Sequence, residues 1–292
     1  MFKYDYQEPK LIAEIGCNHM GDIEIAKELI YLAKESGSNY VKFQKRNNKE
    51  LLTKEQYNSP HPVFENSFGA TYGEHRDNLE FNIQQHKELK AYCDEINIKY
   101  STSVWDITSA KEIINLNPDF IKVPSATNNN FKLLKFLRDD YEGLIQLSVG
   151  MTTRSEIEKI ISFFEETNQA KSRLIVYSCT SGYPVPAEDV ALLEIKWLYD
   201  NYSKRIKDIG FSGHHNGLAL DISAYTLGAR WIERHFTKNR TWKGTDHAAS
   251  LEPQGLKKLV RDLNYTYNAL NYKNEDILPI EKIQREKLKY KK

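Results

Sequence analysis

The chain has 292 residues, with 41 lysines and arginines against 40 aspartates and glutamates, so its formal net charge is +1. This balance excludes a global field that favours nucleic acid or a membrane surface, and no apolar stretch approaches the about 20 residues that a membrane-spanning helix needs. The three cysteines form no CxxC pair and the charged N-terminus has no signal-peptide core, which together favour a reducing, cytoplasmic location.

Eight short apolar runs recur along the chain, and each ends in a polar or reactive residue. The runs span residues 11–16, 40–44, 98–103, 120–125, 144–148, 174–179, 209–214 and 231–236. The clearest helical patterns between them span residues 23–35, 80–95, 153–166 and 192–202. Eight strand–helix repeats without a second composition regime predict an α/β fold, a single-domain (β/α)8 TIM barrel over residues 1–272. We expect residues 273–292 to form a C-terminal basic tail.

One connection is unusually long, the stretch 46–78 between the second strand and its helix. It is too long for an ordinary loop of a barrel, so we expect an irregular segment that is either functional or disordered. It follows the C-terminal end of a strand and therefore lies on the predicted active face.

The residues that close the strands are the candidate site, because active sites of such barrels lie at the C-terminal ends of the strands. Lys42 and Lys122 close the second and fourth runs, and ammonium groups there suit a phosphate or a carboxylate. Four hydroxyl residues share this rim: Thr102, Ser125, Ser148 and Ser212. The set predicts a cradle for a small, doubly charged anion. The alternative is a Schiff base on Lys122, with a depressed pKa between apolar neighbours.

Two histidines close adjacent strands of the predicted barrel, His214 on the seventh and His235 on the eighth. With Glu14 on the adjoining first strand they suit a divalent metal such as Mn²⁺, Fe²⁺, Zn²⁺ or Co²⁺. Glu14 is flanked by apolar residues, so it must pair with a cation or a metal, or hold its proton. Glu233 lies two positions before His235, and alternation puts both on one side of the strand. We expect Glu233 to be either an ion-pair partner inside the barrel or a catalytic group.

Absent motifs exclude further chemistry. The chain contains no GxGxxG, no P-loop and no GxSxG elbow, so nucleotide-dependent chemistry and serine hydrolysis are not indicated.

The sequence resembles the sialic acid synthase family, which condenses phosphoenolpyruvate with an open-chain aldose. The stretches that carry the resemblance run in family order along the barrel: LIAEIGCNHMGD (11–22), YVKFQ (40–44), TYGEHRDNLEF (71–81), IKVPSATNNNF (121–131), LSVGMTT (147–153), CTSGYPVPAEDV (179–190), GFSGHHNG (210–217), ERHFT (233–237) and TWKGTDHAASLEP (241–253). The last of these is especially close to vertebrate-type members.

The resemblance implies a role for each matching residue. It implies phosphoenolpyruvate binding by Lys42, Thr102, Lys122, Ser125, Ser148 and Ser212. It implies that His214 and His235 hold a divalent metal, usually Mn²⁺ with Mg²⁺ or Co²⁺ as alternatives. It implies that the aldose is contacted by Glu14, Gln44, Thr127, Tyr183 and Asp246, and that catalysis rests on Glu14, Lys42, Lys122, His214 and His235. It further implies a homodimer with two small-molecule substrates, no nucleotide cofactor, and no nucleic acid or membrane as partner.

Two departures bear on the acceptor. The family usually places an acid two residues after the serine that matches Ser125, and this chain has Thr127 there. A threonine can hold a water or a sugar hydroxyl, but it cannot serve as a general acid near pH 7. The family also continues into a small antifreeze-like domain that is absent from these 292 residues. Either the sequence is truncated, or this member has a more open site and a different aldose.

Four functions are compatible with these residues. The first is condensation of phosphoenolpyruvate with N-acetylmannosamine or a related hexose. The second is the same reaction with another acceptor, giving a legionaminic acid-like or a shorter ulosonic acid. The third is a Schiff-base pyruvate aldolase, and the fourth is a non-catalytic barrel that binds a sugar.

Overall fold

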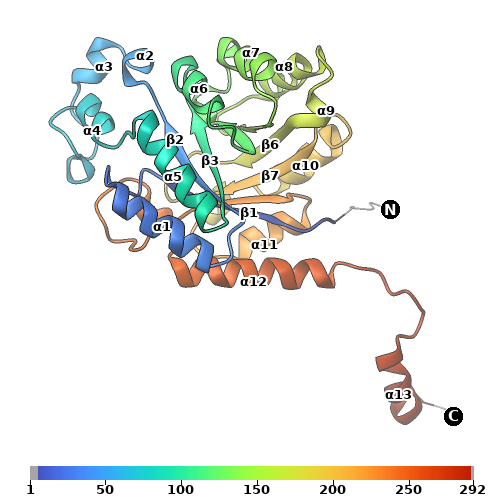
Figure 1. Cartoon of the computed structure of the whole chain (residues 1–292). Helices are drawn as coiled ribbons and strands as arrows, with labels where there is room; N and C mark the ends of the chain where they lie inside the picture. Colours follow the sequence, from blue (N-terminus) through green and yellow to red (C-terminus); the bar gives the residue numbers. More distant parts are fainter. Residues whose placement is uncertain (1–5, 291–292) are drawn as a thin grey trace.

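Eight parallel strands close into a barrel in chain order in the computed structural model of the protein, which describes residues 6–290 (Figure 1). The strands are β1 Lys10–Gly16, β2 Tyr40–Lys45, β3 Lys99–Val104, β4 Phe120–Val123, β5 Leu144–Ser148, β6 Leu174–Cys179, β7 Asp208–Gly213 and β8 Trp231–His235. β1 pairs with both β2 and β8, so Glu14 lies beside Lys42 on one side and beside His235 on the other. The predicted single-domain (β/α)8 barrel is confirmed.

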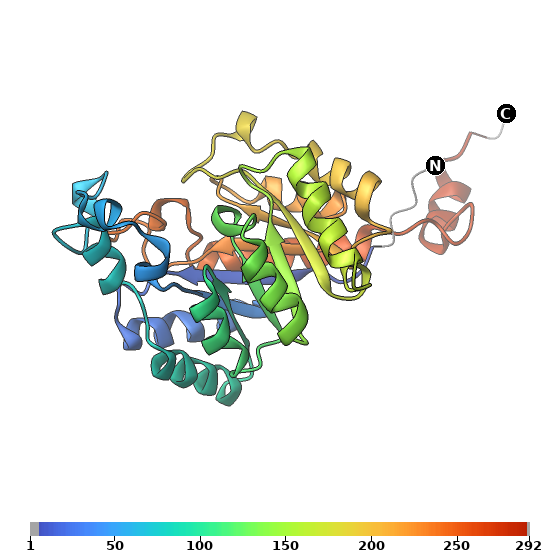
Figure 2. The ribbon, with the colours of Figure 1, turned by 90° about the horizontal axis from the view of Figure 1, so that it is seen from above.

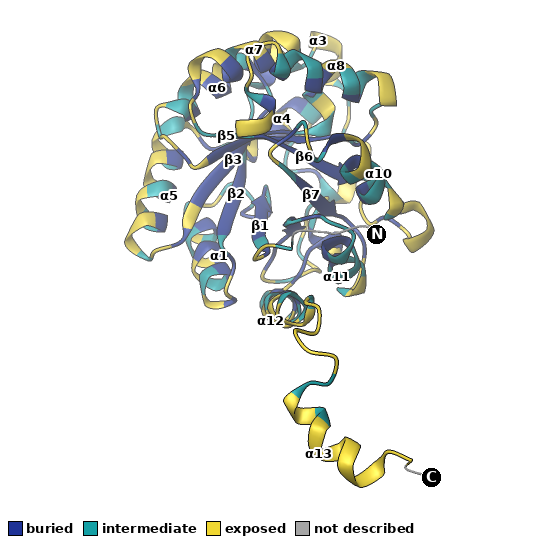
Figure 3. Ribbon diagram, turned by 90° about the vertical axis from the view of Figure 1, so that its right-hand side faces the viewer, coloured by how far each residue is buried: buried dark blue, intermediate teal, exposed yellow. Residues whose placement is uncertain are grey.

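Helices surround the barrel and cover its outer surface with their buried faces (Figures 2 and 3). The α-helices are α1 Ile23–Glu35, α2 Asn48–Leu51, α3 Lys54–Asn58, α4 Tyr72–Asn78, α5 Ile83–Glu95, α6 Ile107–Ile114, α7 Phe131–Asp140, α8 Arg154–Glu165, α9 Ala170–Arg173, α10 Leu193–Tyr202, α11 Ala219–Thr226, α12 Pro253–Ala269 and α13 Pro279–Leu288. Short 3-10 turns are η1 Phe64–Asn66, η2 Ser125–Thr127, η3 Ala187–Asp189 and η4 His247–Ala249.

Local sequence explains where these helices begin. In α1 the buried residues recur at helical spacing, and the carboxylate of Asp22 accepts from the N–H groups of Glu24 and Ile25, which caps the first turn. α5 begins at Ile83 rather than at the predicted residue 80, because the side chain of Asn82 caps the N–H of Gln85.

The interior of the barrel has a floor of large apolar side chains. Most of the core lies between the strands and the outer helices, whereas a smaller cluster fills the barrel itself. Its members are Ile12, Tyr40, Phe120, Ile175, Tyr177 and Trp231. Because side chains alternate along a strand, Tyr40 on the floor implies that Lys42 and Gln44 also point inward, at successively higher levels. The floor therefore directs the polar strand ends towards one open mouth.

The stretch 46–78 is not the irregular segment that we predicted. It folds into α2, α3, η1 and α4, which project beyond the end of β2 (Figures 1 and 2). Thr53 and Thr71 each complete a reciprocal capping box at the start of α3 and α4. These capped turns hold short helices that lack a long apolar pattern, which is why periodicity did not reveal them.

The chain extends away from the barrel after α12. α12 packs on it through Leu256, Leu259 and Leu263, and the chain then extends away to α13, whose residues are not buried (Figure 3). The predicted tail 273–292 thus contains a helix over most of its described length. Within residues 6–290, no helix is long and apolar enough to cross a membrane.

Candidate active site

A cavity of about 330 Å³ opens at the C-terminal ends of the strands. Most of the predicted site residues line it: Glu14, Lys42, Gln44, Lys122, Ser125, Ser148, Tyr183, Ser212, His214 and His235. The strands thus bring together side chains that are more than two hundred residues apart in the chain.

Lys42 connects the first three strands at the base of the cavity. Its ammonium lies 2.5 Å from Glu14 Oε2 and donates to Ser103 Oγ at 2.7 Å. Gln44, one level higher on β2, donates to the other Glu14 oxygen at 3.3 Å. Lys42 and Glu14 are both almost fully buried, so each charge depends on the other rather than on water.

Lys122 forms a second pair on the opposite side of the same base. Its ammonium lies 2.8 Å from Glu233 Oε2 and 4.1 Å from the ring centre of Tyr177. Ser212 donates to the remaining Glu233 oxygen at 3.0 Å, and Lys42 lies 3.8 Å from Glu233. The expected ion-pair role of Glu233 is therefore observed, and two ammonium groups share this carboxylate.

The two carboxylates differ in their protonation. Burial raises the pKa of Glu14, and the nearby charge of Glu233 raises it further, against the opposing effect of Lys42. Burial also disfavours the charged form of Glu233, but Lys122 and Lys42 outweigh it and lower the pKa of Glu233 to about 2. Two carboxylates whose pKa values differ in this way are typical of sites in which one acid exchanges a proton and the other stays ionised.

The pKa of Lys122 is lowered, because burial disfavours its charge more than Glu233 favours it. Lys122 therefore combines a desolvated amine, which Schiff-base chemistry needs, with a carboxylate that holds the proton in place.

The two histidines lie side by side at the upper rim, with ring centres 5.4 Å apart. His214 donates through Nδ1 to the carbonyl of Thr180 at 2.8 Å, which leaves the lone pair on Nε2. Burial lowers the pKa of His214 to about 3, so the ring is neutral at physiological pH. Tyr183 packs 4.3 Å from His214 and 5.7 Å from His235, measured between ring centres.

This pair has the chemistry of metal ligands. A hydrogen bond from one ring nitrogen to a carbonyl, with the other nitrogen free, is the arrangement that orients a ligating histidine. The Nδ1 atom of His235 is buried without a hydrogen-bond partner, 3.8 Å from Asp246 Oδ2. Among residues 6–290, no group of three or more His, Cys, Asp or Glu side chains is gathered closely enough to hold a metal by itself. A metal here would take its remaining ligands from water or substrate.

Three predicted residues do not line the cavity. Thr102 faces outward on β3, in the same direction as Tyr100, whose hydroxyl contacts His86 of α5 at 2.7 Å. The prediction that Thr102 lies on the anion-binding rim is therefore wrong, and Ser103 lines the cavity instead. Thr127 lies just behind the wall, and its hydroxyl is buried without a hydrogen-bond partner. Asp246 is also outside the lining, although its Oδ2 lies 3.8 Å from Nδ1 of the lining residue His235.

Seven lining residues were missed as members of the site: Ser103, Trp105, Pro124, Ala126, Met151, Cys179 and Ser181. Trp105 and Ser181 lie just beyond strand ends, where a loop decides the direction of a side chain. Gly150 was also missed. Its N–H donates to Ser125 Oγ at 3.0 Å, so it belongs to the wall of the cavity. A Cβ atom at Gly150 would lie 2.6 Å from Ser181 Oγ and 2.8 Å from Cys179 Sγ, so only glycine keeps this wall in place.

Comparison with known proteins places this geometry among a set of sugar-acid synthases. The pattern that defines the NeuB family matches residues 29–275. The human N-acetylneuraminate-9-phosphate synthase is 37% identical over 280 residues, which are 95% of this chain and 76% of that protein. The N,N'-diacetyllegionaminic acid synthase of Campylobacter jejuni is 32% identical over 89% of this chain and 77% of its own length. The N-acetylneuraminic acid synthetase of Leptospira borgpetersenii, solved with citrate, superposes with a TM-score of 0.81 at 28% identity, over 98% of this chain and 94% of that one.

Proposed function

Because this chain belongs to the NeuB family of sialic acid synthase-like transferases, we propose that it condenses phosphoenolpyruvate with an open-chain aldose and releases phosphate. The product is a nonulosonic acid, and the acceptor is N-acetylmannosamine or a close relative. The observation that carries the proposal is the cavity itself, in which Lys42, Lys122 and three serines lie below His214 and His235.

The chain's own residues supply most of the chemistry in this proposal. Lys42 and Lys122 bind the phosphate and carboxylate of phosphoenolpyruvate, with hydroxyl contacts from Ser125, Ser148 and Ser212, and offset their charge through the transition state. C3 of phosphoenolpyruvate forms the new bond to the aldehyde carbon. Water then adds at C2, and the resulting tetrahedral centre breaks its C–O bond and releases phosphate. Glu14, with its raised pKa, takes the proton that the attacking water releases, and a proton passes to the alkoxide oxygen of the former aldehyde, so that the product carries a hydroxyl there.

We further propose that His214 and His235 hold a divalent metal, Mn²⁺ with Mg²⁺ or Co²⁺ as alternatives. A metal bound there supplies Lewis-acid polarisation of the aldehyde oxygen. The support is the free Nε2 of His214 and the unpartnered Nδ1 of His235. A homodimer, a cytoplasmic location and the lack of a nucleotide cofactor stay predictions from the family resemblance.

Phosphate release tests the proposed function directly. We expect purified protein with phosphoenolpyruvate and Mn²⁺ to release inorganic phosphate only when an aldose is added, and to stop when EDTA is present. The panel contains N-acetylmannosamine, mannose, arabinose and their phosphates. No release with any of these sugars would contradict the condensation, and undiminished release after exhaustive chelation would contradict the metal.

The Schiff-base alternative is tested by trapping. Incubation with pyruvate and sodium borohydride should leave the intact mass unchanged, because the Lys122 amine is held in an ion pair with Glu233 at 2.8 Å and is not available to attack a carbonyl. Mass spectrometry that located a reduced pyruvate adduct on Lys122 would favour the aldolase instead.

A further inference from the structure

One wall of the cavity continues into a cationic cluster that the proposed reaction does not use. Trp105 follows β3 and lines the cavity. Two guanidinium groups lie against its ring, Arg46 from the end of β2 with its Cζ at 5.5 Å, and Arg76 from α4 with its Cζ at 5.4 Å. The segment 46–78 thus places its positive charge beside the substrate cavity.

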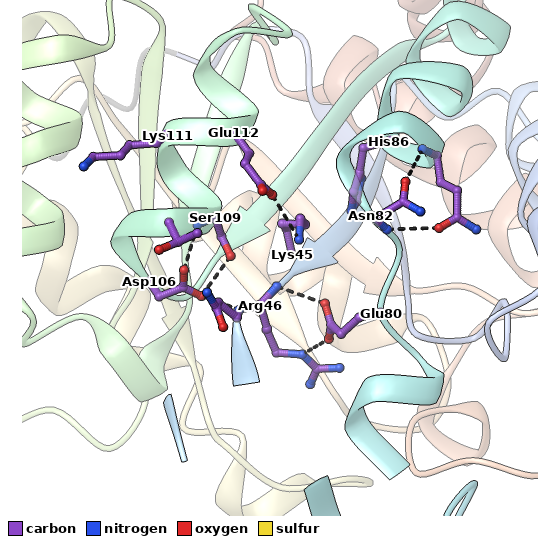
Figure 4. A network of polar contacts seen from close by, with 12 residues as sticks. Lys45, Arg46, Glu80, Asn82, His86, Asp106, Ser109, Lys111 and Glu112 are labelled. Carbon is purple, nitrogen blue, oxygen red and sulfur yellow. Dashed lines mark hydrogen bonds and ion pairs between the residues drawn. The ribbon is translucent and has the colours of Figure 1, made fainter. Parts of the chain in front are cut away.

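The charge of Arg46 is compensated. Its side chain donates through Nε to the carboxylate of Glu80, and its backbone N–H donates to the same carboxylate at 2.9 Å (Figure 4). Its Nη2 contacts Cys17 Sγ at 3.1 Å. Asp106, after β3, accepts from the backbone N–H of Asn47 at 2.7 Å and so fixes the turn that follows Arg46. Arg46 therefore has a structural role in joining β2 to the projecting helices.

The charge of Arg76 is less well compensated: burial and the charge of Arg46 lower its pKa, and the opposing effects of Tyr72 and Glu80 do not offset them. Arg76 is 6% exposed, and it forms no ion pair within 4 Å among residues 6–290. Its Nε is buried without a hydrogen-bond partner, and so is the indole Nε1 of Trp105. Its guanidinium lies against the rings of Trp105 and Tyr72, the latter 5.6 Å from its Cζ. Burying a cation and an N–H donor without an acceptor costs free energy of folding. A bound anion would accept hydrogen bonds from both groups and remove this cost.

The surroundings add positive charge. Lys243, in the loop after β8, lies with its Nζ 5.0 Å from the ring centre of Phe68. Burial and the charges of His61, Arg46, Arg76 and Lys243 lower the pKa of His75 to about 4, so all these cations act at one place. Two arginines and a lysine against the carboxylates of Glu80 and Asp246, which both act on Arg46, leave an excess positive charge that an incoming anion would neutralise.

We propose that Arg76, the Trp105 N–H and Lys243 form a phosphate site for the far end of the acceptor sugar. Guanidinium groups bind phosphate through two parallel hydrogen bonds, which suits Arg76 to this role. The inference rests on the proposed condensation, in which the aldehyde end of the sugar lies at His214 and His235. Adding the three carbons of phosphoenolpyruvate to C1 of a hexose turns its C6 into C9 of the product. A human relative is named as a 9-phosphate synthase, so the acceptor that fits is a hexosamine 6-phosphate.

The test is the ratio of kcat/KM for N-acetylmannosamine 6-phosphate to that for N-acetylmannosamine, at saturating phosphoenolpyruvate. We expect the wild-type protein to prefer the phosphorylated sugar, and Arg76→Gln to lower the ratio by about tenfold to a hundredfold, the effect of losing a charge-assisted hydrogen bond. Lys243 is exposed, so Lys243→Gln folds normally and should lower the ratio by about twofold to fivefold. Arg261→Gln removes the same charge from the exposed face of α12 and should leave the ratio unchanged.

A binding measurement distinguishes failure of the proposed phosphate site from failure of the proposed condensation reaction. Calorimetry measures the affinity of the wild-type protein and of Arg76→Gln for N-acetylmannosamine 6-phosphate, with or without turnover. Phosphate-dependent binding that Arg76→Gln weakens, in a protein that releases no phosphate, would uphold the anion site and contradict the condensation. Turnover with equal preference for both sugars, or a ratio unchanged in both Arg76→Gln and Lys243→Gln, would overturn the anion site alone.

Discussion

Replacing His214 with alanine is expected to lower turnover by about a hundredfold to ten-thousandfold, because the metal proposed at this histidine would contribute several kcal/mol of Lewis-acid stabilisation to the transition state. His214 is the histidine whose free Nε2 is oriented by the carbonyl of Thr180. Its loss would leave a metal at His235 without a second nitrogen ligand. Phosphate release at saturating phosphoenolpyruvate and Mn²⁺ measures the effect on turnover, and electron paramagnetic resonance of free Mn²⁺ measures the loss of metal binding.

A matched variant separates the metal from a general loss of structure. His61 lies on the same face of the barrel but does not line the cavity, so His61→Ala should keep Mn²⁺ binding and most of the activity with N-acetylmannosamine. Phosphoenolpyruvate binding should survive in His214→Ala, since the anion cradle lies lower in the barrel. Full activity of His214→Ala after exhaustive chelation would rule out a metal at this histidine pair.

The barrel and most residues around its open end were predictable, because each parallel strand is buried on both faces and therefore occurs in the sequence as a separate apolar run. The ends of those runs then identify the rim residues without any knowledge of tertiary contacts. Alternation also placed Glu233 and His235 on one side of β8, and both line the cavity. These inferences depend only on local geometry, which the sequence determines strongly.

The errors occur where local geometry is ambiguous. Residues 101–103 of β3 are Ser-Thr-Ser, so neither face of that stretch is marked by apolar side chains, and a shift of one residue exchanged Thr102 for Ser103. Arg76 was missed for a different reason. It belongs to a short helix whose position against Trp105 depends on contacts between distant segments, and nothing in its own neighbourhood in the sequence marks it as buried.

Replacing Glu233 with glutamine is expected to lower the free energy of unfolding by about 3–5 kcal/mol, because two buried ammonium groups lose their shared carboxylate. Among residues 6–290, Lys122 keeps no other anion within 4 Å, and Lys42 keeps only Glu14. Urea denaturation of the ligand-free protein measures the change. Glu158→Gln is the matched control: it also removes a carboxylate paired with a cation, but its side chain is 46% exposed, so its cost should be about 0–1 kcal/mol.

The pH dependence of stability gives a second, independent signature of the same carboxylate. The pKa of Glu233 in the folded protein, about 2, lies below the ordinary value of 4.5. Its ionised form therefore stabilises the fold fully above about pH 4.5, and that contribution is lost as the pH falls from 4.5 towards 2. Glu233→Gln should lose less stability than the wild type over this interval. Phosphoenolpyruvate should also stabilise the variant more than the wild type, because its negative charge replaces the missing carboxylate beside Lys122. If the wild type and Glu233→Gln lost stability equally between pH 4.5 and 2, and phosphoenolpyruvate stabilised both equally, Glu233 would not balance the charge of Lys42 and Lys122.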